Sequence, residues 1–143
     1  MLSNASKYSI KAVLFLAEKS DDSAKYNVQI ISDTLQIPKP FIAKLLQQLA
    51  RARIISSTKG PNGGFYLSKK KKNHSICDII EVIDGPNFFE GCFMGLSKCN
   101  EENPCSVHPI VAQFKEQILH QFKEKTINDF ASEMQQSEGL LGI

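Results

Sequence analysis

Apolar residues recur at intervals of three and four along most of the chain, and this pattern predicts helices. The first helix should cover Asn4 to Lys19, because Ser3 can cap its amino end and a polar loop begins at Ser20. Asn27 is likewise suited to cap a short helix from Val28 to Leu35. The first helix has a second apolar face, made of Leu2, Ile10, Leu14 and Phe15. A partner subunit is one way to cover that face.

Another helix should start between Pro38 and Pro40, because proline is tolerated only in a first helical turn. Its apolar positions are Phe41, Ile42, Leu45, Leu46 and Leu49. Its opposite face has no acidic residue and consists of Lys39, Ala43, Lys44, Gln47, Gln48 and Arg51. Two short helices joined by a tight turn, the second with a basic outer face, are typical of a DNA-binding helix-turn-helix.

A β-hairpin should follow this pair. Residues 54–58 are rich in β-branched side chains, residues 65–67 form a second strand-like run, and both are short. The turn between them is Lys59, Gly60, Pro61, Asn62, Gly63 and Gly64, in which the glycines allow positive φ. A helix-turn-helix with a hairpin behind it is a winged helix, whose small tip fits a minor groove while Lys59 meets phosphate. The predicted fold is therefore mainly α with one small hairpin.

The carboxyl-terminal half contains a long helix that so small a domain cannot cover. Ser75 should cap a helix from Ile76 to Asp84, which Gly85 ends, and an irregular loop fills 86–104. The long helix should run from Pro109 to Lys125, with an apolar stripe at Val111, Phe114, Ile118, Leu119 and Phe122. At about 1.5 Å per residue it is about 25 Å long. We expect it to pack against its copy in a homodimer, which also suits palindromic DNA.

The remaining elements complete a three-part division of the chain. Asn128 should cap a last short helix that contains Phe130 and Met134, and the end, SEGLLGI, should be frayed. We therefore predict a winged-helix DNA-binding domain over 1–85, a cysteine-containing sensor loop over 86–108, and a dimerisation helix with a carboxyl-terminal tail over 109–143.

Charge is distributed unevenly. The net charge is +2, yet residues 34–77 contain nine basic residues and no acid, which leaves −7 for the rest of the chain. A basic block on an otherwise acidic protein is expected of a protein that binds the phosphate backbone of double-stranded DNA. A solvated lysine face without function is the alternative.

Composition argues for a cytoplasmic protein. The sequence has no apolar stretch long enough to span a bilayer, and the first ten residues lack the layout of a signal peptide. In a reducing compartment its four cysteines are better suited to metal or redox chemistry than to structural disulfides.

Three of the cysteines lie in the irregular loop, with the spacing Cys92-x6-Cys99-x5-Cys105-x2-His108. Thiolates are soft ligands for iron–sulfur clusters or zinc, and a neutral imidazole can complete the set. Reversible thiol oxidation without a stable cluster, zinc, and a loop without function remain open. Phe88, Phe89, Phe93 and Met94 could shield the site from solvent. Cys77, on an apolar helix face, should be a buried hydrophobe.

Several segments together resemble the IscR/NsrR family of bacterial regulators. They are Met1–Ser3, Lys7–Ala12, Ile37–Ile42, Ser56–Phe65 and Ile79–Gly85. The segment Ser56–Phe65 is the most diagnostic of the family. The resemblance extends through the cysteine loop into the long helix. It implies a crossed dimer, transcriptional regulation, no enzymatic activity, and a [2Fe–2S] cluster on Cys92, Cys99, Cys105 and His108. The DNA-reading residues that the resemblance implies are Lys39, Pro40, Phe41, Ala43, Lys44 and Gln47 in the recognition helix and Lys59, Gly60, Pro61, Asn62, Gly63 and Gly64 in the wing. Arg51, from the basic face of the same helix, is added to this set.

Departures from the family pattern bear on specificity and ligation. Ala43 stands where members often have a glutamate that touches a base, so the target DNA should differ and Gln47 is left to read adenine. In the wing, Lys59 stands where family members commonly have an arginine, so its contact with DNA should be less geometrically specific. The first cysteine spacing is six residues instead of five. The first acidic residue is Glu18, so the amino-terminal helix lacks the ligand carboxylate of NsrR-like members, which favours His108.

Two other classes compete with this hypothesis. A small electron carrier or iron–sulfur trafficking protein would need the cysteines but neither the basic helix nor the wing. An interaction module that binds a partner regulator would not need the cysteines. An enzyme is the least favoured class, because no nucleophile–base pair stands out.

Overall fold

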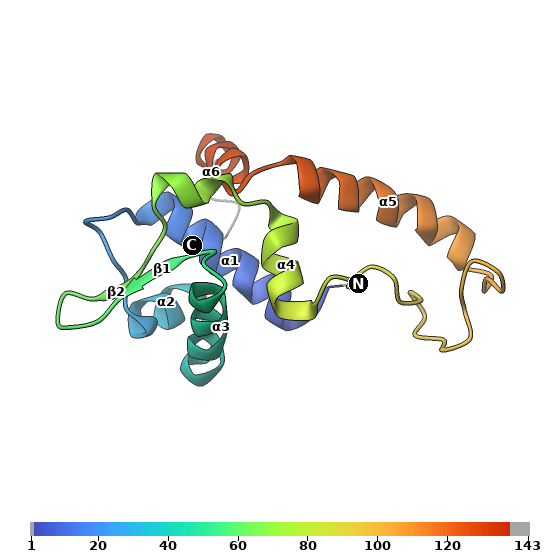
Figure 1. The fold of residues 1–143 in the computed structure, drawn as a ribbon, viewed down its shortest axis with the longest axis horizontal. Coiled ribbons are helices and arrows are strands. Elements are labelled where there is room, and N and C mark those ends of the chain that lie inside the picture. The colour runs from blue at the N-terminus through green and yellow to red at the C-terminus, as the bar shows by residue number, and fades with distance from the viewer. Residues whose placement is uncertain (1, 138–143) are drawn as a thin grey trace.

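The computed structural model describes residues 2–137 and shows a mainly helical chain with one small hairpin (Figure 1). In chain order the elements are α1 (Asn4–Lys19), α2 (Val28–Leu35), α3 (Lys39–Arg51), β1 (Ser56–Thr58), β2 (Gly64–Tyr66), the 3-10 helix η1 (Lys69–Asn73), α4 (Ile76–Asp84), α5 (His108–Glu124) and α6 (Ile127–Gln136). The predicted fold class is confirmed. Apart from Ser137, the end that we expected to fray lies outside the described residues.

Helix α1 lies at the centre of the core and packs against α3, α4 and α6. Its amino end is capped as predicted, because Ser3 Oγ accepts a hydrogen bond from the Ser6 amide at 3.0 Å. Leu14 and Phe15 are buried by this chain alone, and the Phe15 ring meets Tyr26 edge-on with centroids 5.2 Å apart. The expectation that their face awaits a partner subunit is therefore wrong for these two residues.

The two helices of the helix-turn-helix meet through a tight turn. Gln36 ends α2 in the left-handed region at φ 55°, and Ser32 Oγ donates to the Ile37 carbonyl at 2.7 Å. Ile42, Leu45, Leu46 and Leu49 of α3 are buried as predicted. Phe41 departs from that set: it is 38% exposed and rests edge-on against Tyr8 of α1, with centroids 5.7 Å apart.

The wing is an antiparallel pair in which Ser57 faces Phe65. The loop after α1 pairs with the second strand of the wing, because the backbones of Tyr26 and Phe65 exchange hydrogen bonds of 3.0 and 2.8 Å. The first strand begins at Ser56 rather than at residue 54, since Ile54 and Ile55 are buried in the core instead of pairing.

The lysine run forms η1, which the pattern did not predict. Two of its lysines bond inward. Lys71 Nζ donates to the Ile55 carbonyl at 3.0 Å, and Lys72 Nζ donates to the Ala17 carbonyl in the last turn of α1 at 2.7 Å. Burial, followed by the nearby Arg53 charge, lowers the pKa of Lys71. The ammonium groups of Lys71 and Lys72 therefore connect η1 to the chain before the wing and to α1, and they are not free on a basic surface.

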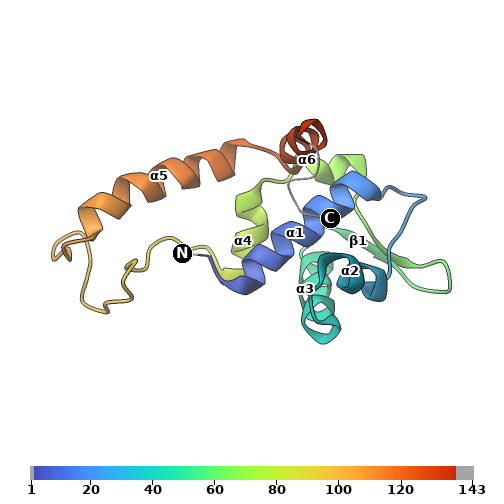
Figure 2. The same ribbon diagram turned by 180° about the vertical axis from the view of Figure 1, so that it is seen from behind.

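The chain then leaves the core and returns. Helix α5 extends away from the body, and the loop that precedes it lies at its far end (Figure 1, Figure 2). Helix α6 returns to α1 and buries Ile127, Ala131 and Met134. Its cap is Thr126, through a capping box with Asp129, and not Asn128 as predicted. Among residues 2–137 no helix is both long and apolar enough to cross a membrane.

Candidate thiol site and nucleic-acid interface

The cysteine loop is built from short turns between α4 and α5. Gly85 ends α4 with φ 88°, and the Gly95 amide closes a turn on the Cys92 carbonyl at 2.9 Å. A further turn joins the Cys99 amide to the Leu96 carbonyl at 3.2 Å, and the His108 amide bonds to the Cys105 carbonyl at 3.0 Å. These turns fold the loop back on itself in front of the first turn of α5.

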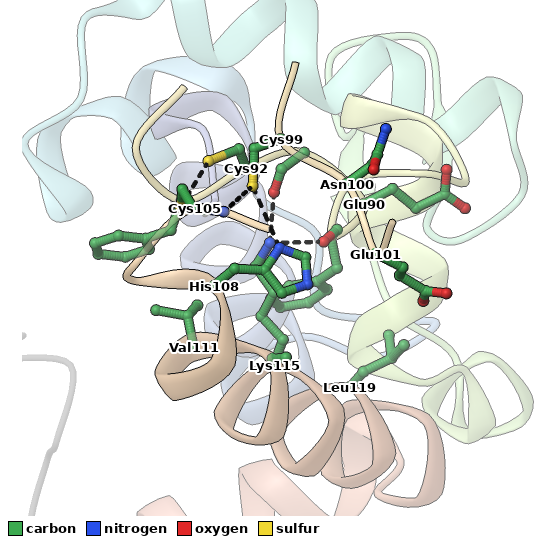
Figure 3. A pocket seen from close by; sticks show the side chains of 14 residues that line it. Glu90, Cys92, Cys99, Asn100, Glu101, Cys105, His108, Val111, Lys115 and Leu119 are labelled. Carbon is green, nitrogen blue, oxygen red and sulfur yellow. Dashed lines mark hydrogen bonds between the residues drawn. The ribbon is translucent and has the colours of Figure 1, made fainter. Parts of the chain in front are cut away.

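The folded loop brings the three thiols together. The Sγ atoms of Cys92, Cys99 and Cys105 all lie within 4.8 Å of one another, and all three residues are half-buried. The sulfur atoms of Cys92 and Cys105 are 3.9 Å apart (Figure 3). Residues 13 apart in the sequence therefore present a compact group of soft donors.

His108 lies beside the three thiols and contacts one of them. It is the first residue of α5, and its Nδ1 is 3.3 Å from Cys99 Sγ. Cys99 therefore contacts His108 as well as the two other thiols, and the four donors lie at one place in front of α5 (Figure 3).

Local hydrogen bonds separate the acidities of the thiols. The backbone amides of Leu96 and Met94, with smaller help from the neighbouring thiols, lower the pKa of Cys92 from 9.0 to about 7. The amide of Cys105 acts in the same direction on Cys99, but burial and the two other cysteines outweigh it, and the pKa of Cys99 is raised. Cys92 is therefore the thiol that most readily becomes the nucleophilic or ligating thiolate.

A cavity of about 490 Å³ opens between this loop and α5. Besides the donors, its lining includes Phe89, Glu101 and Lys115. The expected aromatic shield is only partly present: Phe88 packs on Phe89 with centroids 4.7 Å apart. Phe93 lines the cavity but is 56% exposed, and Met94 is 58% exposed, so both leave much of their surface in solvent within one chain.

On the helix-turn-helix, the outer face of α3 is open to solvent. Its exposed residues are Lys39, Pro40, Phe41, Lys44, Gln47 and Arg51, and Ala43 is half-buried among them. Arg53, which the sequence did not single out, extends this basic face just past the helix and adopts a left-handed φ of 63°. No pattern signals that backbone conformation for an arginine.

The tip of the wing is exposed at Lys59, Gly60, Pro61 and Asn62, whereas Gly63 and Gly64 are half-buried. Gly60 has φ 102°, as the turn prediction requires. Gly63 is needed for a different reason, because a Cβ there would lie 2.3 Å from the Thr58 carbonyl oxygen. The cysteine site and the DNA-facing elements are separate parts of one chain, joined through α4 and α1.

A helix-turn-helix with a basic second helix, backed by a two-stranded wing, defines the winged-helix class of DNA-binding proteins. The family model described as Rrf2, iron-dependent transcriptional regulator, matches residues 2–133. The chain belongs to the Rrf2 family of transcriptional regulators, which are not enzymes. An HTH-type transcriptional regulator of Aquifex aeolicus is 37% identical over 131 residues, which is 90% of each chain.

Solved structures agree on the fold. CymR of B. subtilis, described as the global cysteine regulator, superimposes with a TM-score of 0.71 at 20% identity and covers 93% of this chain and 97% of its own. IscR of T. potens gives the same TM-score at 18% identity, with 96% and 90% covered. The resemblance found in the sequence is confirmed at the level of the family.

Proposed function

We propose that this regulator binds palindromic promoter DNA as a homodimer and senses its signal through a [2Fe–2S] cluster held by the cysteine loop. The observation that carries the proposal is the convergence of three thiols and His108 at one end of α5. A loop without function has no reason to gather the thiols of residues 92, 99 and 105 within 4.8 Å.

The DNA roles follow from exposure and donor chemistry. Lys39, Lys44 and Arg51 offer cations to phosphates, and Gln47 is placed to pair with adenine in the major groove. The open wing tip, from Lys59 to Asn62, would enter the adjacent minor groove, with Gly63 and Gly64 holding its turn. Pro40, Phe41 and Ala43 provide the apolar part of the reading surface.

The donor set fits the cluster. Three sulfurs and one imidazole nitrogen are the four protein ligands that a two-iron core requires. Cys92, Cys99, Cys105 and His108 would hold the cluster. Once bound, the cluster supplies a one-electron redox centre, and its histidine nitrogen makes it sensitive to pH.

The homodimer is supported by the uncovered side of α5. None of its residues is buried, and Ile110 and Phe114, one turn apart, are 74% and 54% exposed. A second copy of this helix is an apolar surface of matching shape and length, and its two-fold axis would place two α3 helices on a palindrome.

Signal transmission would run from the loop to α3. Ordering or release of residues 86–107 would shift α4 and α5, and with them the spacing of the two recognition helices. A coupling of about 1–3 kcal/mol gives a 5- to 150-fold change in DNA affinity.

A second candidate keeps the DNA role and replaces the cluster by thiol chemistry. Its support is the pKa of Cys92 near 7, beside Cys105 at 3.9 Å. A peroxide would oxidise the Cys92 thiolate to a sulfenic acid and be reduced to water or an alcohol, and condensation with the Cys105 thiol would form a disulfide with loss of water, which would be the signal.

Anaerobic purification separates these candidates. We expect an absorbance spectrum of a cluster with about two irons and two sulfides per chain. Serine variants of Cys92, Cys99 and Cys105 should lose iron, whereas Cys77→Ser, at a buried position outside the loop, should retain it. DNA sites selected from a random pool should then be bound differently with and without the cluster. Equal binding by both forms would exclude cluster sensing.

A further inference from the structure

The start of the cysteine loop is fastened to α5 by one side chain. Lys115 Nζ donates to the Phe89 carbonyl at 3.0 Å and to the Gly91 carbonyl at 2.5 Å (Figure 3). Gly91 directly precedes Cys92, and Lys115 lies about two helical turns after His108. The ammonium group therefore holds the backbone immediately before the first thiol.

The loop has few other polar links to the rest of the protein. Among the described residues, its remaining hydrogen bonds are turns within residues 87–108, such as Glu90 to Asn87 and Asn100 to Asn103. The Cys99–His108 contact is the second link to α5. Two polar anchors on one helix thus fix the two sides of the loop, His108 near Cys99 and Lys115 near Cys92.

Lys115 also carries the charge that the cavity needs. It is the one lysine or arginine in the described lining, which otherwise includes the acids Glu90 and Glu101. Three thiolates packed together repel one another and the nearby carboxylates. An ammonium group on the same wall offsets part of that negative charge.

We propose that Lys115 is the positioning residue of the thiol site. It holds Phe89 to Gly91 on α5, which fixes where Cys92 lies, and it supplies the cation that makes thiolate binding of a metal favourable. Because Lys115 and the exposed Ile110 and Phe114 share α5, the geometry of the site depends on the packing of that helix. The effect of Lys115 on metal affinity, tested below, rests on the proposed function. Its effect on the backbone of the loop, also tested below, does not.

The test uses the full metal-free chain and four variants. Lys115→Met keeps the length of the side chain and removes its donors and charge. Lys115→Gln keeps a donor without charge, and Lys115→Arg keeps both. The control is Lys123→Met, since Lys123 is an exposed lysine in the last turn of α5, far along the helix from the thiols, for which the described residues provide no hydrogen bond or ion pair.

Hydrogen–deuterium exchange reports the fastening directly. We expect Lys115→Met to speed amide exchange between residues 89 and 96, with α1 to α4 unchanged. Cobalt(II) titration, read from the charge-transfer bands of thiolate ligands, should show about 10- to 100-fold weaker binding. Lys115→Arg should restore both readouts, Lys115→Gln should restore exchange better than affinity, and Lys123→Met should alter neither.

The outcomes separate this inference from the proposed function. If Lys115→Met matches the wild type in exchange, or if Lys115→Arg fails to rescue, the positioning role is wrong. Faster exchange throughout α1 to α4 would mean a general fold defect, and would also overturn it. If the wild type binds no cobalt at its thiols, the metal role fails, while exchange still decides whether Lys115 fastens the loop.

Discussion

The environments of Cys92 and Cys99 give these two thiols different acidities, although both lie in one loop. The Leu96 and Met94 amides lower the pKa of Cys92 to about 7, whereas the pKa of Cys99 is raised. In metal-free protein we therefore expect iodoacetamide to label Cys92 first, with a rate that rises as pH increases through about 7. Mass spectrometry of the labelled sites checks this order. Equal rates at the three thiols, all rising only above pH 9, would contradict it.

Asp84 joins the carboxyl end of α4 to the amino end of α1. Its carboxylate accepts hydrogen bonds from the hydroxyls of Ser3 at 2.6 Å and Ser6 at 2.7 Å. Partial burial alone would raise the pKa of Asp84, but these bonds outweigh it and the pKa is lowered from 3.8. A lowered pKa in the folded state stabilises the fold above the unfolded value, and the stabilisation is lost as pH falls below it.

Asp84→Asn should therefore lower the free energy of unfolding at pH 7, by about 1–2 kcal/mol. The difference from the wild type should shrink as pH falls below about 4, where the unfolded chain takes up a proton at this carboxyl, and should vanish once the folded carboxylate is protonated as well. Urea unfolding at a series of pH values measures this. Asp22→Asn is the matched control, because Asp22 is exposed and lies in a loop. A difference that does not vary with pH would show that the charge is irrelevant.

At the scale of elements, local patterns predicted most of the fold. The bounds of α1, α2 and α4 coincide with those expected, because their caps and apolar spacing are encoded within a few residues. The first strand was predicted to begin too early. Ile54 and Ile55 have strand-like side chains, but burial in the core determines their place. Likewise, Thr126 and Asn128 are both good caps, and only the capping box with Asp129 selects Thr126.

The outer face of α3 carries Ala43 where the resemblance to the IscR/NsrR family implies a glutamate. Ala43 offers only a methyl group, whereas a glutamate there accepts a hydrogen bond from cytosine. We expect Ala43→Glu to change the base preference at one position in each half-site towards a C·G pair. Selection from a random DNA pool followed by sequencing measures the preference. Lys44→Glu, on the adjacent exposed position, should instead weaken binding to all sequences, since it removes a phosphate contact. An unchanged preference in Ala43→Glu would place the base-reading residues elsewhere.

For the molecule as a whole, sequence spacing indicates which residues form the thiol site but not how they are held. The soft donors at positions 92, 99, 105 and 108 indicate metal or thiol chemistry, and the resemblance to the IscR/NsrR family implies that these four form the site. The bonds from Lys115 to Phe89 and Gly91 join residues 26 and 24 apart, and no local pattern predicts such a contact. The inward bonds of Lys71 and Lys72 are equally beyond prediction, because a lysine run has the same pattern whether it faces solvent or a carbonyl.

The exposed apolar side of α5 is the surface through which we propose that two copies of the chain associate. Ile110 and Phe114 lie on one face, and burying a side chain of either kind in a dimer is worth about 1.5–3 kcal/mol. A charge at either position must be desolvated on association. We therefore expect Ile110→Asp with Phe114→Asp to weaken dimerisation at least about 100-fold, as each 1.4 kcal/mol is a factor of ten. Sedimentation velocity should show monomers at micromolar concentration.

The same double variant should fold, because none of α5 is buried in the isolated chain. Glu116→Lys is the control, since it changes charge at an exposed position of α5 that lies about 120° around the helix axis from Ile110 and on nearly the opposite side from Phe114. It should remain dimeric. On a palindromic DNA site, the monomeric variant should bind each half-site independently and lose the tight complex of the wild type, since a dimer presents both recognition helices together. A double variant that stays dimeric and binds the palindrome normally would show that subunits associate through another surface, and that α5 serves the thiol site alone.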